Sequence, residues 1–207
     1  MAATLYHLKI SLRGVRPPVW RRMRVPGAMS LDKVHHALQI ALGWTNSHLH
    51  QFLVGEERYG MLDPDDDWRD ETIDERKVRL EQIANIRSKF VYEYDFGDGW
   101  EHDVVVEGVE EATELDWTPV CLDGRRACPP EDCGGSYGYA NLIKILANPR
   151  HPEHAEMKDW APPDFSPEHF DLPAINKDLR SVAARWRPRT PSRQRTKRIA
   201  APKPANQ

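Results

Sequence analysis

The 207-residue sequence is poor in cysteine and lacks any long apolar run. A helix that crosses a bilayer needs about 20 consecutive apolar residues, so no membrane-spanning segment is expected. The first ten residues lack the basic stretch followed by an apolar one that marks a secretory signal. Only three cysteines are present, and an odd number without a signal favours a reducing compartment. We therefore expect a cytoplasmic protein with free or metal-ligating thiols.

Acidic residues are absent from both ends of the chain. Residues 1–29 carry six Lys/Arg and residues 185–207 carry eight, with no Asp or Glu in either segment. The remaining 15 basic residues share segment 30–184 with all 32 acidic residues, which gives that segment a net charge of −17. The sequence thus predicts an acidic body with basic ends.

The length and the seven tryptophans indicate one folded domain with a proper core. We assign residues 1–187 to this single domain. Residues 188–207 alternate Arg, Pro, Ser and Thr and have almost nothing to bury. They are expected to form a disordered, basic, Pro/Arg-rich tail.

Hydrophobic periodicity predicts an α+β fold with a mixed, mainly antiparallel sheet of about five strands covered by helices. Arg21 interrupts the apolar face of the second strand, which suggests a strand end or an edge strand. Segments 56–76 and 110–136 show no clear periodicity and are expected to be irregular. The expected strands are 5–12, 19–25, 48–54, 90–96 and 100–106, and the expected helices are 31–42, 137–147, 152–160 and 173–186.

Segment 90–102 predicts a β-hairpin, because an alternating run rich in aromatic residues and a second alternating run that begins at Trp100 flank a turn that contains glycine. A two-residue turn at Asp98-Gly99 would place an aromatic residue opposite a charged one. A three-residue turn, Gly97-Asp98-Gly99, keeps the apolar sets together and pairs Tyr94 with His102. We therefore predict the three-residue turn, with its final glycine in the left-handed conformation.

Several long motifs occur in order along the chain and together carry a family resemblance. They are Tyr6-His-Leu-Lys-Ile10 with Pro18-Val-Trp-Arg-Arg22, then Leu49-His-Gln-Phe52, Tyr92-Glu-Tyr-Asp-Phe-Gly-Asp-Gly-Trp-Glu-His102, Cys128-Pro-Pro-Glu-Asp-Cys-Gly-Gly135, Tyr137-Gly-Tyr139 and the stretch 151–171. Over residues 4–184 the chain resembles the plasmid pRiA ORF-three-like family, which includes insertion-element passenger proteins. The resemblance implies an α+β sheet covered by helices, in a protein of bacteria, archaea or their mobile elements. It implies no established molecular activity.

One group of residues could form a metal site. His48 and His50 alternate on one predicted strand, so both imidazoles face the same side. His102 lies in the hairpin, with Asp95 and Asp98 near its tip. If these strands are neighbours, the group suits zinc, or iron or manganese where oxygen ligands dominate. In the alternative interpretation the histidines are satisfied by hydrogen bonds and Asp98 is simply a turn residue.

The three cysteines form a second candidate group. Only Cys128 and Cys133 show the close spacing typical of structural zinc sites, and Cys121 lies further away. A fourth ligand would have to come from elsewhere, such as His102 or His151. The alternative is three small, buried, reduced thiols.

The segment Pro129–Gly135 leads into a predicted helix and offers candidate catalytic groups. Glu131 and Asp132 could act as acids or bases if they are buried, as could Asp98 at the hairpin tip. Alternatively, these carboxylates hold a structural loop through hydrogen bonds. This segment is not a phosphate-binding P-loop, because it lacks the Gly-Lys-Ser/Thr sequence with which such a loop ends.

Two functions follow from these patterns. The favoured one is a non-catalytic binding or accessory module of a plasmid or mobile element, which contacts protein or nucleic acid. The alternative is a metal-dependent hydrolase with a His/Asp/Glu site, for which zinc would be the cofactor. The basic tail could contact nucleic acid without sequence preference. In the alternative interpretations it only solubilises the protein, or it folds back on the acidic body, whose charge would oppose the approach of DNA. The candidate contacts are Arg189, Arg193, Arg195, Lys197 and Arg198, with Trp20, Arg22 and Arg24 extending the surface.

Overall fold

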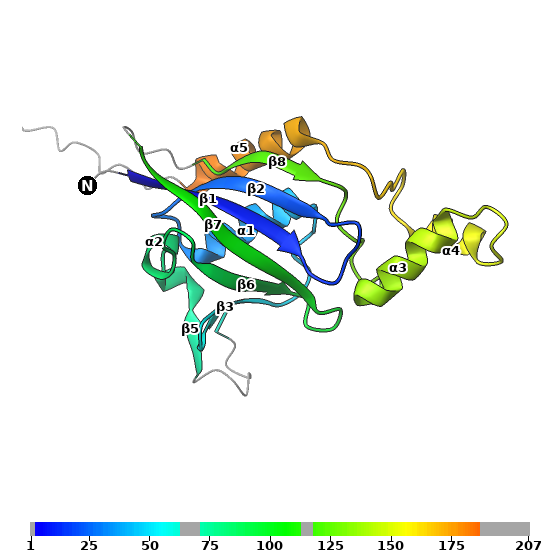
Figure 1. Ribbon diagram of the computed structural model, residues 1–207, viewed down its shortest axis with the longest axis horizontal. Coiled ribbons are helices and arrows are strands. Elements are labelled where there is room, and N and C mark those ends of the chain that lie inside the picture. Colours follow the sequence, from blue (N-terminus) through cyan, green and yellow to red (C-terminus); the bar gives the residue numbers. More distant parts are fainter. Residues whose placement is uncertain (1–2, 63–70, 113–117, 187–207) are drawn as a thin grey trace, which may run out of the picture.

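The computed structural model describes residues 3–62, 71–112 and 118–186. They form an α+β fold built on one eight-stranded sheet with the order β5-β4-β3-β6-β7-β1-β2-β8. All neighbouring strands are antiparallel except β4 and β5, which are parallel. The predicted fold class is confirmed. Figure 1 shows this sheet with α1 behind it and with α3 and α4 projecting at one side.

The sheet has more strands than the sequence predicted. Three short strands lie in segments expected to be irregular: β4 and β5 flank the acidic stretch 63–67, which falls within an undescribed part of the chain, and β8 precedes the loop that carries Cys128. Short strands with few alternating apolar residues give a weak sequence signal. The strands are β1 (Ala3–Leu12), β2 (Trp20–Pro26), β3 (His50–Val54), β4 (Glu57–Gly60), β5 (Thr72–Asp74), β6 (Lys89–Tyr94), β7 (Trp100–Ala112) and β8 (Val120–Arg125).

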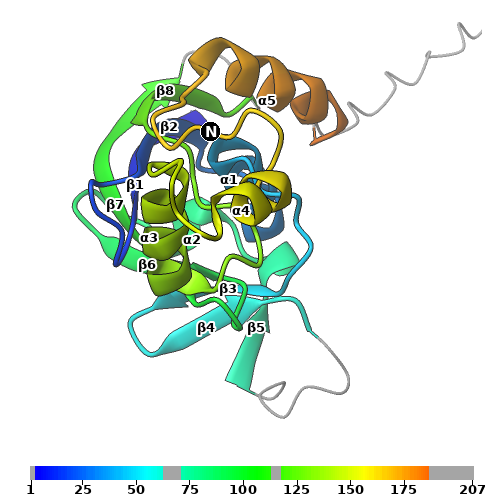
Figure 2. The ribbon, with the colours of Figure 1, turned by 90° about the vertical axis from the view of Figure 1, so that its right-hand side faces the viewer.

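The helices agree with the periodicity of the sequence. Helix α1 (Leu31–Leu42) ends at Gly43, which adopts the left-handed conformation that favours glycine. In the side view, α1 lies against one face of the sheet, with α5 beside it (Figure 2). The other helices are α2 (Leu80–Ile83), α3 (Gly135–Leu146), α4 (His154–Trp160) and α5 (Leu172–Trp186), and a short 3-10 turn covers Glu75–Lys77.

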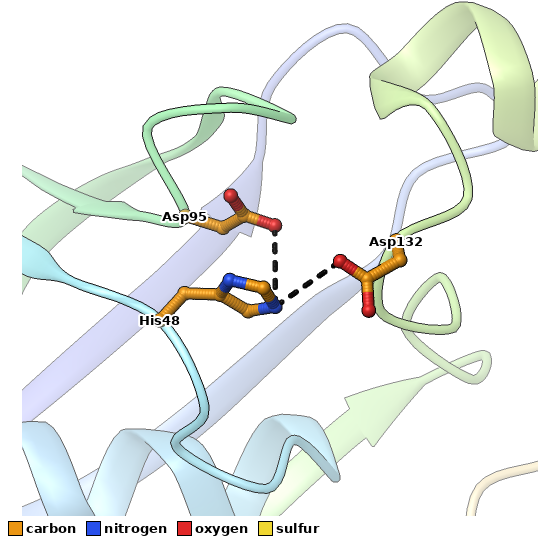
Figure 3. Close-up of side chains that lie close together, drawn as sticks. All are labelled: His48, Asp95 and Asp132. Atoms are coloured by element: carbon orange, nitrogen blue, oxygen red, sulfur yellow. Dashed lines mark ion pairs between the residues drawn. The ribbon is translucent and has the colours of Figure 1, made fainter.

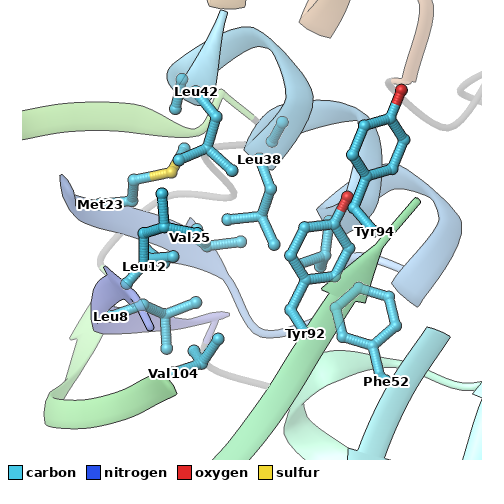
Figure 4. Close-up of a cluster of buried hydrophobic side chains, with 14 of the residues drawn as sticks. Leu8, Leu12, Met23, Val25, Leu38, Leu42, Phe52, Tyr92, Tyr94 and Val104 are labelled. Carbon is cyan, nitrogen blue, oxygen red and sulfur yellow. The ribbon is translucent and has the colours of Figure 1, made fainter. Parts of the chain in front are cut away.

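The core lies between α1 and the covered face of the sheet. The alternating apolar residues of β1 and β2 are buried, as are the residues that recur at helical spacing along α1. Figure 4 shows how these aliphatic side chains meet aromatic residues of β3 and β6. The labelled cluster comprises Leu8, Leu12, Met23, Val25, Leu38, Leu42, Phe52, Tyr92, Tyr94 and Val104.

The hairpin register differs from the predicted one. Tyr94 pairs with Trp100, and His102 pairs with Tyr92, so the turn comprises residues 95–99 instead of three residues. The final glycine has φ +66°, as predicted. The three-residue turn assumed that Phe96 must be buried, but Phe96 is 49% exposed and belongs to the turn. The longer turn still keeps the aromatic faces together, because it shifts the pairing by an even number of residues.

Arg21 lies at a strand end, one of the two possibilities that its interruption of the apolar face suggested, because β2 begins at Trp20. It does not mark an edge strand, which was the other possibility. Strand β2 lies between β1 and β8. The side chain is only 3% exposed on the covered face. Its Nε donates to the carbonyl oxygen of Ala41 at 2.7 Å, near the C-terminal end of α1 where a cation is favoured.

Candidate metal centre

Three side chains from separate segments converge at one end of the sheet. His48 precedes β3, Asp95 begins the hairpin turn, and Asp132 lies in the loop before α3 (Figure 3). His48 Nε2 lies 3.7 Å from Asp95 Oδ2 and 3.3 Å from Asp132 Oδ1. One ligand atom from each of these residues lies within 4.8 Å of the other two. We call this group the His48 cluster.

The position of His48 depends on Tyr94, the last residue of β6. The backbone N–H groups of Ser47 and His48 donate to the Tyr94 hydroxyl at 2.9 and 3.3 Å. Tyr94 in turn donates to Glu131 Oε1 at 2.5 Å. A buried tyrosine therefore connects the segment before β3 to the loop that carries Asp132.

Asp95 is held in the turn by one carboxylate oxygen and offers the other to the cluster. Its backbone N–H donates to the carbonyl of Leu49 at 2.8 Å, which anchors the turn beside His48. Its Oδ1 accepts the backbone N–H groups of Gly97 and Asp98 at 3.0 and 3.3 Å. Its Oδ2 is the oxygen that faces His48. The residue is 6% exposed, so a carboxylate is buried beside an imidazole.

Backbone strain accompanies two of the three cluster residues. Asp95 has φ +57° and Asp132 has φ +59°, both in the left-handed region that non-glycine residues rarely adopt. Aspartate tolerates this region better than most residues do, but the conformation still costs on the order of 1 kcal/mol or more. Such strain persists where surrounding contacts impose it, and it concentrates at functional sites.

The cluster has the composition and spacing of a site for a divalent transition metal. Its donor set is one imidazole nitrogen and two carboxylate oxygens, which zinc, manganese and iron accept. Zinc binds nitrogen and oxygen at about 2.0–2.2 Å in a tetrahedral arrangement, which places ligand atoms roughly 3.3–3.6 Å apart. The two distances from His48 Nε2, 3.7 and 3.3 Å, are close to this spacing. His48 Nε2 is buried and makes no hydrogen bond of acceptable geometry, although both carboxylates are near. The Nε2 atom of His48 therefore points between two carboxylate oxygens and forms no hydrogen bond with either.

A polar cavity of about 510 Å³ opens beside the cluster, and His48 forms part of its wall. We call it the histidine pocket. It is lined mainly by polar side chains from α1, the 46–50 segment and the 3-10 turn, among them His35, His36, Asn46, His50 and Glu75.

The other predicted histidines do not join the cluster. His50 turns into the histidine pocket, where Nε2 lies 2.8 Å from Glu75 Oε2 and the ring stacks on His35. His102 is fully buried, and its Nδ1 donates to the carbonyl of Tyr92 at 3.1 Å. Burial lowers the pKa of His102 to about 4, so this ring is neutral near pH 7. In the described ranges, His48, Asp95 and Asp132 are the only group of three or more ligating residues at this spacing.

The cysteines likewise remain outside the cluster. All three are free thiols, and none belongs to a group of three or more potential ligands within the described parts of the chain. Burial raises the pKa of Cys128 to about 11 and that of Cys133 to about 12. They are therefore protonated near neutral pH, as expected of small buried thiols.

The candidate catalytic carboxylates have different surroundings. Asp98 accepts the backbone N–H of Gly134 at 3.1 Å, which ties the hairpin tip to the start of α3. Glu131 accepts hydrogen bonds from Tyr94, from the Thr45 hydroxyl and from the Thr45 backbone N–H. Burial acts to raise the pKa of Glu131, but these hydrogen bonds outweigh it and lower the pKa below its ordinary value. Asp132 is the one of the three that lies in the His48 cluster, and it is largely exposed.

Sequence reasoning missed two members of this region. Glu75 is the partner of His50, and nothing near it in the sequence points to a site. His35 does carry a signal, because it lies on the apolar side of α1 beside Val34, where a histidine needs a partner.

The candidate tail residues Arg189, Arg193, Arg195, Lys197 and Arg198 lie outside the described residues, as does the proposed boundary at residue 187.

Comparisons with known proteins agree with this fold. The family model of the plasmid pRiA4b ORF-3-like protein matches residues 4–174. The uncharacterized protein y4hQ of Sinorhizobium fredii is 39% identical over 189 residues, which cover 90% of this chain and 96% of that protein. The crystal structure of MM3350, a protein of unknown function from Methanosarcina mazei Go1, matches with a TM-score of 0.75 and 32% identity, covering 83% of this chain and 97% of the other. No helix in the described ranges is both long and apolar enough to span a membrane. The chain belongs to the plasmid pRiA4b ORF-3-like family.

Proposed function

We propose that the protein is a metal-binding accessory module in which a divalent transition metal is held by His48, Asp95 and Asp132. The observation that carries the proposal is the convergence of one nitrogen and two oxygens within 4.8 Å from three separate segments. Bound metal would fasten the segment before β3, the hairpin turn and the loop before α3 to one another. The module would then present a fixed loop surface to its partner.

Calorimetric titration of metal-free protein with Mn²⁺ and Zn²⁺ tests this proposal. We expect one site per chain, lost in His48→Gln, which removes the imidazole, and weakened at least about tenfold in Asp132→Asn, which replaces a carboxylate by a neutral amide. Asp164→Asn is the matched control, since Asp164 is also exposed and has φ +59° but lies outside the cluster. Binding that is unchanged in His48→Gln would overturn the proposal.

A metal-dependent hydrolase is the second candidate, favoured by the polar cavity beside His48. The metal would activate a water molecule, and a substrate would occupy the histidine pocket. Glu131 accepts three hydrogen bonds, whereas Asp98 accepts one through Oδ2, so Asp98 is the less engaged of the two candidate bases. Metal-loaded protein should then hydrolyse p-nitrophenyl phosphate or acetate, and His48→Gln should not. Hydrolysis that persists in His48→Gln, or no hydrolysis by protein with bound metal, argues against an enzyme on these substrates.

The basic C-terminal segment supports nucleic acid as a partner of the module. Its eight Lys/Arg could neutralise phosphates without sequence preference. On the sheet, Arg22 is already paired with Glu107 at 2.8 Å, so that face contributes little free positive charge. Deletion of residues 187–207 should abolish any shift of duplex DNA in electrophoresis. A shift that survives the deletion would exclude the tail as the contact.

A further inference from the structure

A second cavity, separate from the histidine pocket, lies between the end of α1, the loop before α3 and the start of α5. Its volume is about 440 Å³, within the range of sites for small molecules. Apolar side chains form much of its wall, among them Ile40, Trp44, Phe165 and Ile175. Arg21 also lines it, so we call it the Arg21 cavity.

The guanidinium of Arg21 has unused hydrogen-bonding capacity in this cavity. Nε donates to the carbonyl of Ala41 at 2.7 Å, and Nη1 donates to the carbonyls of Trp20 and Arg125 at 2.8 and 3.1 Å. The two protons of Nη2 have one partner, the Cys128 sulfur at 3.8 Å, which is a weak acceptor. Arg21 and Cys128 both line the cavity, so this contact joins two residues of its wall.

The charge of Arg21 is buried without a countercharge. The residue is 3% exposed, and no carboxylate of the described residues lies within 4.0 Å of it. Phe170 stacks over the guanidinium at 4.8 Å. A side chain on Gly124 would collide with both, because its Cβ would lie 2.6 Å from Phe170 and 2.8 Å from Arg21. Three carbonyls and one ring hold the cation in place, but they do not neutralise it.

Acidic residues also line the cavity, but their carboxylates are either exposed to solvent or already hydrogen-bonded to other groups. Asp171 and Asp178 are exposed, and an Asp171 oxygen accepts the backbone N–H of Ala174 at 2.9 Å. Glu131 is held by Tyr94 and Thr45. Water and salt screen the exposed charges much more than they screen a buried guanidinium. The deep end of the cavity therefore favours an anion.

We propose that the Arg21 cavity binds a small organic carboxylate with an apolar body. The carboxylate would accept hydrogen bonds from Nη2 of Arg21, and the body would lie against Trp44, Phe165 and Ile175. This site shares neither ligand chemistry nor any of the three metal ligands with the His48 cluster, so it can be tested independently of the metal.

The test titrates the full chain by calorimetry with three carboxylates, 3-phenylpropionate, octanoate and indole-3-acetate, and with the neutral amide of each. At least one carboxylate should bind with a dissociation constant below about 1 mM, and its amide should bind at least about tenfold more weakly, because only the carboxylate pairs with the cation. Ile175→Trp, which fills the cavity, should abolish binding. Ile86→Trp is the matched control, since Ile86 is 61% exposed and does not line the cavity.

Arg21→Met should remove the preference for carboxylate over amide. If this variant does not fold, the comparison of carboxylate with amide in the unaltered chain and the Ile175→Trp variant still decide the question. Equal binding of acid and amide, binding that survives Ile175→Trp, or no binding of any carboxylate at about 5 mM would each overturn the proposal.

Discussion

The imidazole rings of His35 and His50 stack face to face in the histidine pocket, with centroids 3.3 Å apart and planes at 3°. His35 is also hydrogen-bonded on both sides, to the Tyr92 hydroxyl at 2.8 Å and to Asn46 at 2.6 Å. Burial, followed by the neighbouring His50, lowers the pKa of His35 to about 3. His35 is therefore a neutral, buried histidine that the folded protein keeps from protonation.

Acid should destabilise the protein through its buried histidines. The folded pKa values of His35 and His102, about 3 and about 4, lie below the ordinary value of 6.5, so the unfolded chain binds more protons between these limits. Their contribution to stability is complete above pH 6.5 and is lost as the pH falls, towards about 4 for His102 and about 3 for His35. The loss should be on the order of a few kcal/mol, measured by urea unfolding at intervals from pH 7 to pH 4.

His35→Gln should flatten this pH dependence, even though it removes hydrogen bonds and lowers stability at pH 7. The matched control is His36→Gln, because His36 is the exposed neighbour on the same helix. If His35→Gln has the same slope as the unaltered protein, protonation of His35 does not drive acid unfolding.

Glu131 should matter more for stability than an ordinary exposed carboxylate. Glu131→Ala leaves the Tyr94 hydroxyl and the Thr45 backbone N–H without their acceptor, which should cost about 1–3 kcal/mol in urea unfolding. Glu56→Ala, at an exposed turn, should change the free energy of unfolding by less than about 0.5 kcal/mol. Similar values for the two variants would contradict the role of Glu131 as the connection between these segments.

Two glycines with similar backbone conformations should respond differently to alanine. Gly43 has φ +84°, and an added Cβ would have no atom within 4 Å, so Gly43→Ala should cost only the strain, about 1 kcal/mol. Gly135 has φ +66°, and an added Cβ would lie 2.7 Å from the carbonyl oxygen of Asp98. Gly135→Ala should therefore be the more destabilising variant in thermal or urea unfolding. Equal effects would mean that the hairpin tip does not pack closely on the start of α3.

Metal bound at the His48 cluster should stabilise the folded protein, because the three ligands are brought together only by folding. At a free metal concentration of 100 times the dissociation constant, the gain should be about 2.7 kcal/mol. Differential scanning fluorimetry should show a rise in Tm with Mn²⁺ or Zn²⁺, absent in His48→Gln and kept in Asp164→Asn. An equal rise in both variants would place the metal elsewhere.

The sequence by itself determined the fold class, the main strands and the helices. Residues such as Leu8, Met23 and Leu38 alternate or recur at the spacing of their element, and the same spacing buries them. It also determined the family, through motifs that lie in order along the chain. His48 and Asp95 could be found as polar groups at the ends of predicted strands, and Asp132 as a carboxylate in the loop before a predicted helix, because residue type and local pattern are visible there.

Only the tertiary structure decided which of these groups meet. Local spacing says nothing about which strands are neighbours. It could therefore not show that His48 joins the cluster while His50 does not, or that His102 is buried in the core. The register of the hairpin depended on whether Phe96 is buried. The burial of Arg21 depended on β8, a strand with too few alternating apolar residues to give a clear signal. Sites built from distant segments are set by packing across the whole sheet, and this packing brings His48, Asp95 and Asp132 together.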